Sequence, residues 1–201
     1  MANNDEPTLV TMYREPVDRC RSHWAYLHRL CKDPLKSQSD HCARMMKTYP
    51  DTAQGQLRFI QMSGTQSEGF QKWLNIRSPQ VSFQWIQNNV HFWGVSDRYS
   101  LSLCLLWFQA GLTDKLNSSV CSCEAKRRRT QAGDPQVFVK HLNSAPMQKG
   151  NEARLNVSDE YIASFLLPDI ELFQLLRTEF MQRVRRMEID TGVSMYPCSS
   201  S

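Results

Sequence analysis

A fixed positive charge and a hydroxyl group lie eight residues apart near the start of the chain, at Arg14 and Ser22. Thr8–Tyr13 reads as a short strand, and Pro16 suits the first position of a helix because its fixed φ and missing N–H cost nothing there. Arg14 therefore follows the end of a strand, and Ser22 lies about two turns into a helix. A guanidinium group binds phosphate oxygens in a bidentate fork, and open α/β sheets bind ligands beyond the carboxyl ends of their strands. The pair predicts a phosphate clamp.

The helix that begins at Pro16 is expected to run to about Cys31, because its apolar residues repeat at helical spacing. This apolar stripe consists of Val17, Cys20, Trp24, Leu27 and Cys31. Ser22 lies off the stripe, which is where a hydroxyl that faces a ligand should lie.

A second strand-to-helix step is expected in the middle of the chain. Phe92–Val95 reads as a buried strand, and Ser96 or Asp97 is expected to cap the helix that follows. The apolar residues of that helix are Leu101, Cys104, Leu105, Phe108 and Leu112. Gly111 fits its end. The segment Val81–Ile86 fits either a strand or the end of a helix.

Two helices are expected near the end of the chain. Ser158 should cap a short one, Pro168 should interrupt it, and Asp169 should open a longer one that reaches about Met187. The apolar face of the longer helix consists of Phe173, Leu176, Phe180, Val184 and Met187. Its arginines are expected to form a solvated basic face, and they are Arg177, Arg183, Arg185 and Arg186.

The segment Arg14–Ser22, with the sequence Arg-Glu-Pro-Val-Asp-Arg-Cys-Arg-Ser, resembles a known phosphate-binding motif. It is similar to the 3′-phosphate motif of sulfotransferases that use 3′-phosphoadenosine-5′-phosphosulfate (PAPS), above all the Golgi carbohydrate enzymes of the heparan sulfate 2-O-sulfotransferase type. In that family the Arg and the Ser hold the 3′-phosphate, so the resemblance implies this role for Arg14 and Ser22. Three further segments resemble later landmarks of the family in the same order: Gln56–Gly64, His91–Leu103 and Asp169–Phe180.

The resemblance implies an α/β fold, a P-loop NTPase-like three-layer sandwich with a parallel sheet. It covers residues 1–190, from the 3′-phosphate motif to the closing helix, with a loop insertion over 113–136 and a disordered tail over 191–201. The family also has a P-loop strand and a catalytic His or Glu before the motif, and the sequence holds neither, so the catalytic residues stay unassigned. We expect a truncated gene model or an alternative start, rather than a half-domain that evolved as such, and we expect little turnover from the chain alone.

The segment Val137–Ser144 resembles the strand and loop that close over the nucleotide in this family. On that resemblance Asn143 and Ser144 are candidate contacts on the 3′-phosphate side, and Lys140 is a further one. The resemblance implies PAPS as the sulfuryl donor and a hydroxyl group of a glycan as the acceptor. It implies no metal, and Cys121-Ser-Cys123 lacks the spacing and second ligand pair of a zinc site.

The seven cysteines are an odd number, so at least one thiol is unpaired. Cys20 and Cys104 fall on predicted apolar helix faces and are expected to be buried, as free cysteines commonly are. If the protein is lumenal, some of the seven cysteines are expected to form disulfides. Two glycosylation patterns, at Asn117 and Asn156, agree with a secretory history.

Composition and targeting signals limit which ligands and which cellular compartments fit the sequence. The net charge of +4 suits an anionic nucleotide or a sulfated glycan and is too small to demand nucleic acid. No window has the length and apolarity of a membrane span, and the first residues have no signal-peptide pattern. The chain as written would stay in the cytoplasm, whereas the family resemblance implies the Golgi.

Two alternatives stay open. One is a non-catalytic nucleotide-binding or scaffolding remnant of a sulfotransferase. The other is a basic nucleic-acid-binding protein that uses Lys126–Arg129, a run whose default reading is a solvated loop. We favour a nucleotide over a nucleic acid because the run is short and the net charge is modest.

Overall fold

The computed structural model describes residues 9–32, 39–62, 78–118, 120–123 and 154–195. Over these residues the chain is an α/β protein that is mostly helical and has a two-stranded parallel sheet. It divides into two compact units. We call residues 14–84 and 146–174 the helical unit, and residues 1–13, 85–145 and 175–201 the sheet unit.

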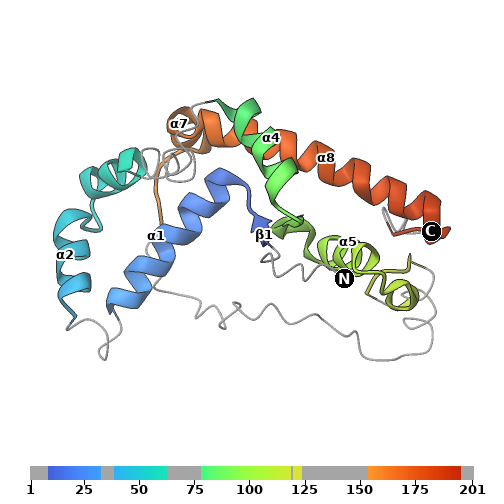
Figure 1. Cartoon of the computed structure of the whole chain (residues 1–201). Coiled ribbons are helices and arrows are strands. Elements are labelled where there is room, and N and C mark those ends of the chain that lie inside the picture. Colours follow the sequence, from blue (N-terminus) through green and yellow to red (C-terminus); the bar gives the residue numbers. More distant parts are fainter. Residues whose placement is uncertain (1–8, 33–38, 63–77, 119, 124–153, 196–201) are drawn as a thin grey trace, which may run out of the picture. The chain divides into compact units, whose positions relative to one another are not determined.

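The elements follow one another along the chain as Figure 1 labels them. They are β1 (Val10–Tyr13), α1 (Pro16–Lys32), α2 (Asp40–Thr48), α4 (Pro79–Asn89), β2 (Phe92–Val95), the 3-10 turn η1 (Ser96–Arg98), α5 (Tyr99–Gln109), the 3-10 turn η2 (Thr113–Asn117), α7 (Asp159–Phe165) and α8 (Leu167–Thr191). Residues 53–62 are also helical.

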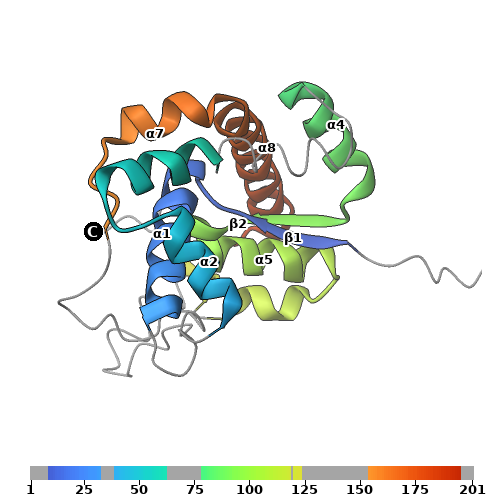
Figure 2. The same cartoon turned by 90° about the vertical axis from the view of Figure 1, so that its left-hand side faces the viewer.

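The sheet unit is built on the parallel pair β1 and β2, which Figure 2 shows side by side with α5 next to them. Val10 pairs with Phe92 and Tyr13 with Val95. Every residue of β2 is buried, whereas the residues of β1 alternate between exposed and half-buried. Both strands predicted from the sequence are confirmed.

The side chain of Ser102 on α5 closes the outer edge of β2. The N–H of Phe92 donates to the carbonyl oxygen of Leu9, and alternate residues of a parallel strand face the same neighbour, so the backbone of Val95 faces away from β1. Ser102 Oγ accepts from the Val95 N–H at 2.8 Å and donates to its carbonyl at 3.0 Å. Only 1% of Ser102 is exposed, so water does not supply hydrogen bonds at this place. The hydroxyl of Ser102 therefore provides the partners that the Val95 N–H and C=O need.

Gly94 lets β1, β2 and α5 approach one another. A Cβ atom at Gly94 would lie 2.5 Å from Met12 Sδ and 2.6 Å from Ser102 Cβ. Both distances are well inside van der Waals contact, so only glycine fits this strand position without displacing its neighbours.

The start of α5 differs from the sequence prediction. Neither Ser96 nor Asp97 caps it, because these residues form η1 and α5 begins at Tyr99 without a side-chain cap. Its end is as predicted, since Gly111 has a φ of 74°. The ambiguous segment Val81–Ile86 is helical and lies within α4.

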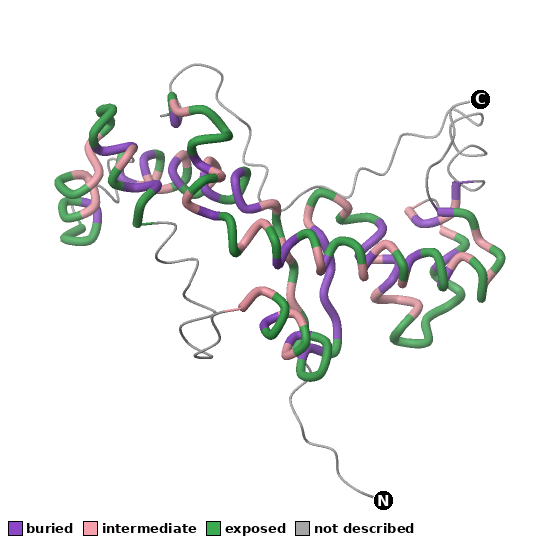
Figure 3. The backbone as a smooth tube through the Cα atoms, turned by 90° about the horizontal axis from the view of Figure 1, so that it is seen from above, coloured by how far each residue is buried: buried purple, intermediate pink, exposed green. Residues whose placement is uncertain are grey.

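Helix α8 runs from Leu167 to Thr191, so Pro168 lies in its first turn, where it removes no helical hydrogen bond. The five predicted apolar residues are all buried, and Figure 3 shows how buried and exposed residues alternate along the helices. The prediction of a solvated basic face is wrong for Arg183. Its guanidinium carbon lies 3.7 Å from the ring centroid of Trp93, which is itself buried. Arg177, Arg185 and Arg186 are exposed.

The helical unit has its core between α1, the helical residues 53–62, and α7. Helix α1 begins and ends within one residue of the prediction, and four of its five predicted stripe residues are buried, with Leu27 half-buried. The buried core residues are Val17, Cys20, Trp24, Phe59, Ile60, Leu155, Ile162 and Leu166. Ser39 caps α2 by accepting from the Cys42 N–H, and Ser158 caps α7 as predicted.

Two disulfides join cysteines that both lie within the described residues. Cys31–Cys42 joins α1 to α2, and Cys104–Cys121 joins α5 to the segment after η2. Cys104 is therefore buried as predicted but is not a free thiol, because the chain after η2 brings Cys121 back to α5. Cys20 is buried, as predicted, and is not part of a disulfide.

Cys123 is also disulfide-bonded. Among the described residues, no group of His, Cys, Asp and Glu side chains is arranged to hold a metal ion. Nor does that part of the chain contain a helix with the length and apolarity needed to span a bilayer.

The bonds of Ser102 predict a large effect of a small substitution. Ser102→Ala leaves the buried N–H and C=O of Val95 without partners, which should lower the free energy of unfolding by about 2 to 3 kcal/mol. Ser100→Ala, on the exposed face of the same helix, is the control and should change it by less than about 0.5 kcal/mol. Equal urea-denaturation midpoints for the two variants would contradict this role of Ser102.

The disulfides give a second stability prediction. They close segments of 11 and 17 residues, and loop-closure entropy assigns about 3 kcal/mol to each. We expect the Cys31→Ser/Cys42→Ser and Cys104→Ser/Cys121→Ser variants to unfold at lower urea concentrations than the parent chain. Peptide mapping without reductant should recover both linked pairs, and free thiols at these four positions would refute the pairing.

Candidate functional site

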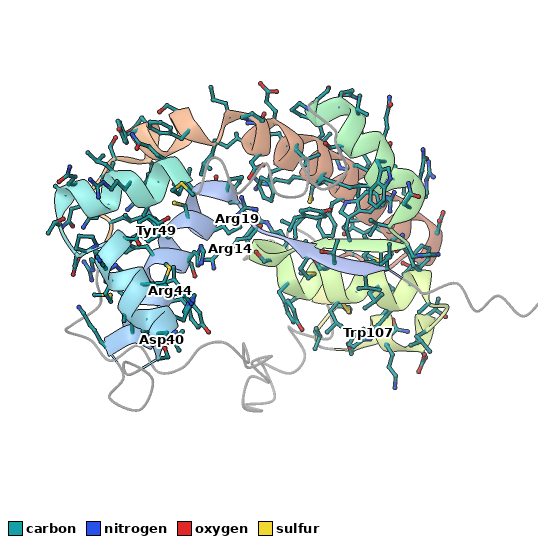
Figure 4. The ribbon with its side chains drawn as sticks, turned by 60° about the vertical axis from the view of Figure 1, so that its left-hand side comes forward. Arg14, Arg19, Asp40, Arg44, Tyr49 and Trp107 are labelled. Atoms are coloured by element: carbon teal, nitrogen blue, oxygen red, sulfur yellow. A yellow bond between two sulfur atoms is a disulfide. The ribbon has the colours of Figure 1, made fainter. Side chains whose placement is uncertain are left out.

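Arg14 lies between β1 and α1, and Figure 4 labels it just before the first turn of the helix. Its side chain is exposed. It makes no hydrogen bond or ion pair with any residue that the structure describes. The guanidinium group of Arg14 is therefore accessible to a ligand, as the sequence predicts.

Ser22 lies on α1, about 9 Å along the helix axis from Pro16 at the usual rise per residue. Its side chain is half-buried, and its hydroxyl has no hydrogen-bond partner among the described residues. Ser22 lies off the apolar stripe, as predicted, because the buried residues Cys20 and Trp24 lie on the other face of the helix.

The N-terminus of α1 is already capped. The side chain of Glu15 accepts a hydrogen bond of 2.7 Å from the Asp18 N–H, and its carbonyl oxygen accepts from the Arg19 N–H. The carboxylate satisfies the Asp18 N–H and places negative charge at the positive end of the helix dipole. A phosphate that touches both Arg14 and Ser22 must therefore lie along the side of α1 and be held by side chains.

The other two arginines in this part of α1 are committed to structural contacts. Arg19 forms an ion pair with Asp169. Arg21 donates from Nε to Asp159 at 2.8 Å and from its two terminal nitrogens to the carbonyl oxygens of Leu155 and Val157 at 2.8 and 2.7 Å. Acidic and carbonyl oxygens therefore bind the guanidinium groups of Arg19 and Arg21. Of these three arginines, only Arg14 makes no hydrogen bond or ion pair among the described residues.

The segment that Arg21 holds is also held by Gln56, which is 5% exposed. Its amide donates to the carbonyl oxygen of Arg154 at 3.1 Å and accepts from the Asn156 N–H at 2.8 Å. Gln56 and Arg21 together fix residues 154–157 against α1 and the helical residues 53–62. Neither role was predicted from the sequence. The position of Gln56 within an apolar helical repeat is a local signal of its burial, whereas Arg21 has no such signal.

The remaining predicted contacts cannot be placed. Asn143, Ser144 and Lys140 lie outside the described residues, as does the basic run Lys126–Arg129. The structure therefore brings Arg14 and Ser22 into the same compact unit and leaves the other candidates as predictions.

The histidines differ sharply in environment. Burial, with a smaller effect of the nearby Arg19 charge, lowers the pKa of His23 below its usual value. Burial also lowers the pKa of His28, of which only 3% is exposed. His91 has a structural role, because its Nδ1 accepts from the Leu9 N–H at 3.2 Å. His41 is exposed on α2.

One further group near the clamp has a shifted pKa. Burial raises the pKa of Tyr13, the last residue of β1, to about 12. Its phenol therefore stays protonated and uncharged at neutral pH.

The contacts of Arg21 predict that the shape of its side chain matters more than its charge. Arg21→Lys keeps the charge but loses the fork that reaches Asp159 and two carbonyl oxygens, so unfolding should become easier by about 1 to 3 kcal/mol. Arg29→Lys, at an exposed position on the same helix, is the matched control and should have little effect. Indistinguishable thermal unfolding of the two variants would show that residues 154–159 do not depend on Arg21.

Comparison of the chain with protein-family models, with curated proteins and with solved structures found no match in any of the three.

Proposed function

We propose that Arg14 and Ser22 bind the 3′-phosphate of a PAPS-type nucleotide, and that the chain is part of a sulfotransferase that transfers a sulfuryl group from PAPS to a hydroxyl group of a carbohydrate. The observation that carries this proposal is the contrast along α1. Arg19 and Arg21 are held by acidic and carbonyl oxygens, whereas Arg14 is exposed and without a partner among the described residues.

The chemistry of the pair suits a phosphate monoester. The guanidinium group of Arg14 would supply two parallel charge-assisted hydrogen bonds, and the hydroxyl of Ser22 a third donor. Each such bond is worth about 1.5 to 3 kcal/mol when it is made to a charged group. Binding energy from this end of the nucleotide would position the distant sulfuryl group, which is how non-reacting parts of a substrate lower a barrier.

The finer fold belongs to the same proposal. Val10 and Met12 of β1 are 54% and 39% exposed, and the alternation of the ladder directs their backbone groups away from β2. Parallel sheets occur almost only with both faces covered and several strands paired. We infer that β1 is an internal strand of a larger parallel sheet of the P-loop NTPase-like, three-layer type, with a further strand along this edge.

The disulfides support an oxidising compartment for the proposed reaction. Cys31–Cys42 and Cys104–Cys121 would persist in an oxidising environment, whereas the cytosol keeps such thiols reduced. We therefore place the proposed reaction in the lumen of the secretory pathway, and the Golgi is the compartment that the family resemblance implies. A glycan acceptor is available there.

Calorimetric titration with two matched nucleotides tests the proposal. 3′-Phosphoadenosine-5′-phosphate and adenosine-5′-phosphate differ only in the 3′-phosphate, so we expect the first to bind at least about tenfold more tightly. Arg14→Ala should remove most of this difference, and Ser22→Ala a smaller part. Arg29→Ala, which removes an exposed arginine elsewhere on α1, should leave it unchanged.

The outcomes separate the alternatives. Equal affinity of the parent chain for the two nucleotides, or an Arg14→Ala variant that keeps the difference, would contradict the clamp. Nucleotide binding that never leads to sulfuryl transfer, even in a longer polypeptide, would favour the non-catalytic remnant. Steeply salt-dependent binding to any nucleic-acid duplex, unaffected by Arg14→Ala, would favour the nucleic-acid-binding alternative.

A further inference from the structure

A histidine is enclosed in the helical unit at the contact between α1 and α2. His28 is 3% exposed, and its ring centroid lies 3.9 Å from that of Trp24. Its Nδ1 atom is buried and has no hydrogen-bond partner among the described residues. The imidazole faces a shallow apolar pocket, whose lining consists of Trp24, Leu27, His28, Met45, Met46, Tyr49 and Phe59.

The neutral ring suits these surroundings. Burial lowers the pKa of His28 and outweighs the hydrogen bond to the backbone of Tyr49, which favours the protonated ring. A proton on Nδ1 would place a positive charge and an unsatisfied donor among aromatic rings and thioethers. Attraction of an imidazolium to the face of Trp24 would offset only part of that cost.

The charged groups nearby largely cancel. Asp51 favours the protonated ring and Lys32 disfavours it, but Lys32 Nζ lies 3.8 Å from Asp51 Oδ2, so each screens the other. His23 packs edge to face on Phe59 at 5.4 Å between ring centroids. No acidic side chain among the described residues lines the pocket.

We propose that His28 is an acid-sensitive latch, whose neutral ring holds α2 and Tyr49 on α1 and whose protonation releases them. The release would be local and reversible, because the Cys31–Cys42 disulfide keeps α2 tethered to α1 after the aromatic contacts open. Since α1 also carries Ser22, acid would loosen the helix on which the proposed phosphate clamp depends. The latch itself stands on the packing of His28 and holds whether or not a nucleotide binds.

The direction of the pH effect follows from linkage. Burial lowers the pKa of His28 in the folded chain below its ordinary value of 6.5, so the unfolded or opened state binds the proton more readily. The stabilising contribution is complete above about pH 6.5 and is lost as the pH falls below that value. Between pH 7.5 and 5.5 the opening equilibrium should rise by up to about tenfold from this group.

Oxidation of the pocket methionines by dilute hydrogen peroxide reports the opening. Met45 and Met46 line the pocket and are half-buried, so mass spectrometry should show them oxidised several-fold faster at pH 5.5 than at pH 7.5. Met62, which is 42% exposed and lies outside the pocket, should react at nearly the same rate at both pH values. In His28→Phe, which keeps an aromatic ring and cannot be protonated, the rates at Met45 and Met46 should not depend on pH.

Controls distinguish His28 from the other histidines of the unit. His41→Gln removes an exposed histidine from α2, and His23→Gln removes the one packed on Phe59; both should keep the acid response. Should His28→Phe fail to fold, His28→Gln and an NMR titration of the imidazole in the parent chain replace it. An acid response that persists in the His28 variant, that disappears in His23→Gln, or that is absent from the parent chain would overturn the latch.

Discussion

The burial of one face of α1 is the constraint on which the helical unit depends. Trp24 has no exposed surface, and Cys20 and Val17 lie with it in the same core as Phe59 and Ile162. Burying a Trp or Val side chain contributes about 1.5 to 3 kcal/mol or more, so this face fixes the rotation of the helix. That rotation turns Ser22 away from the centre of the core and leaves Arg14 exposed at the start of the helix.

Hydrogen bonds of long polar side chains complete the unit around α1. Arg21 and Gln56 satisfy backbone groups of residues 154–157, a segment without helical or strand partners of its own. Buried backbone groups need such partners, and a forked guanidinium can serve several at once. These side chains are used for structure, whereas Arg14 before α1 and Arg29 near its end make no hydrogen bond or ion pair among the described residues; of these two, Arg14 is the one that lies at the end of a strand.

Periodicity in the sequence predicted the elements well where one face is buried. The bounds of α1, the strand Phe92–Val95 and the apolar face of α8 follow from repeats at helical or strand spacing. The predicted cap of α5 was wrong because Ser96–Arg98 form a 3-10 turn, so that the helix begins only at Tyr99 and has no side-chain cap. The pairing of Cys104 with Cys121 and the stacking of Arg183 on Trp93 depend on contacts between distant segments, which no local pattern encodes.

The candidate site was predictable only in part, for the same reason. The positions of Arg14 and Ser22 follow from a strand, a turn and a helix that are adjacent in sequence. Whether neighbouring cations are free or paired depends on Asp159 and Asp169, about 140 and 150 residues further along the chain. The enclosure of His28 likewise needed the fold of α2 and the helical residues 53–62 against α1.

The central proposal is that the chain binds the 3′-phosphate of the nucleotide. Phosphorus NMR of 3′-phosphoadenosine-5′-phosphate tests it directly, because the two phosphates give separate signals. Adding the protein should shift and broaden the 3′-phosphate signal, and the Arg14→Ala variant should leave that signal as it is in free nucleotide. A 3′-phosphate signal that the parent chain does not perturb, or that both proteins perturb equally, would contradict the account.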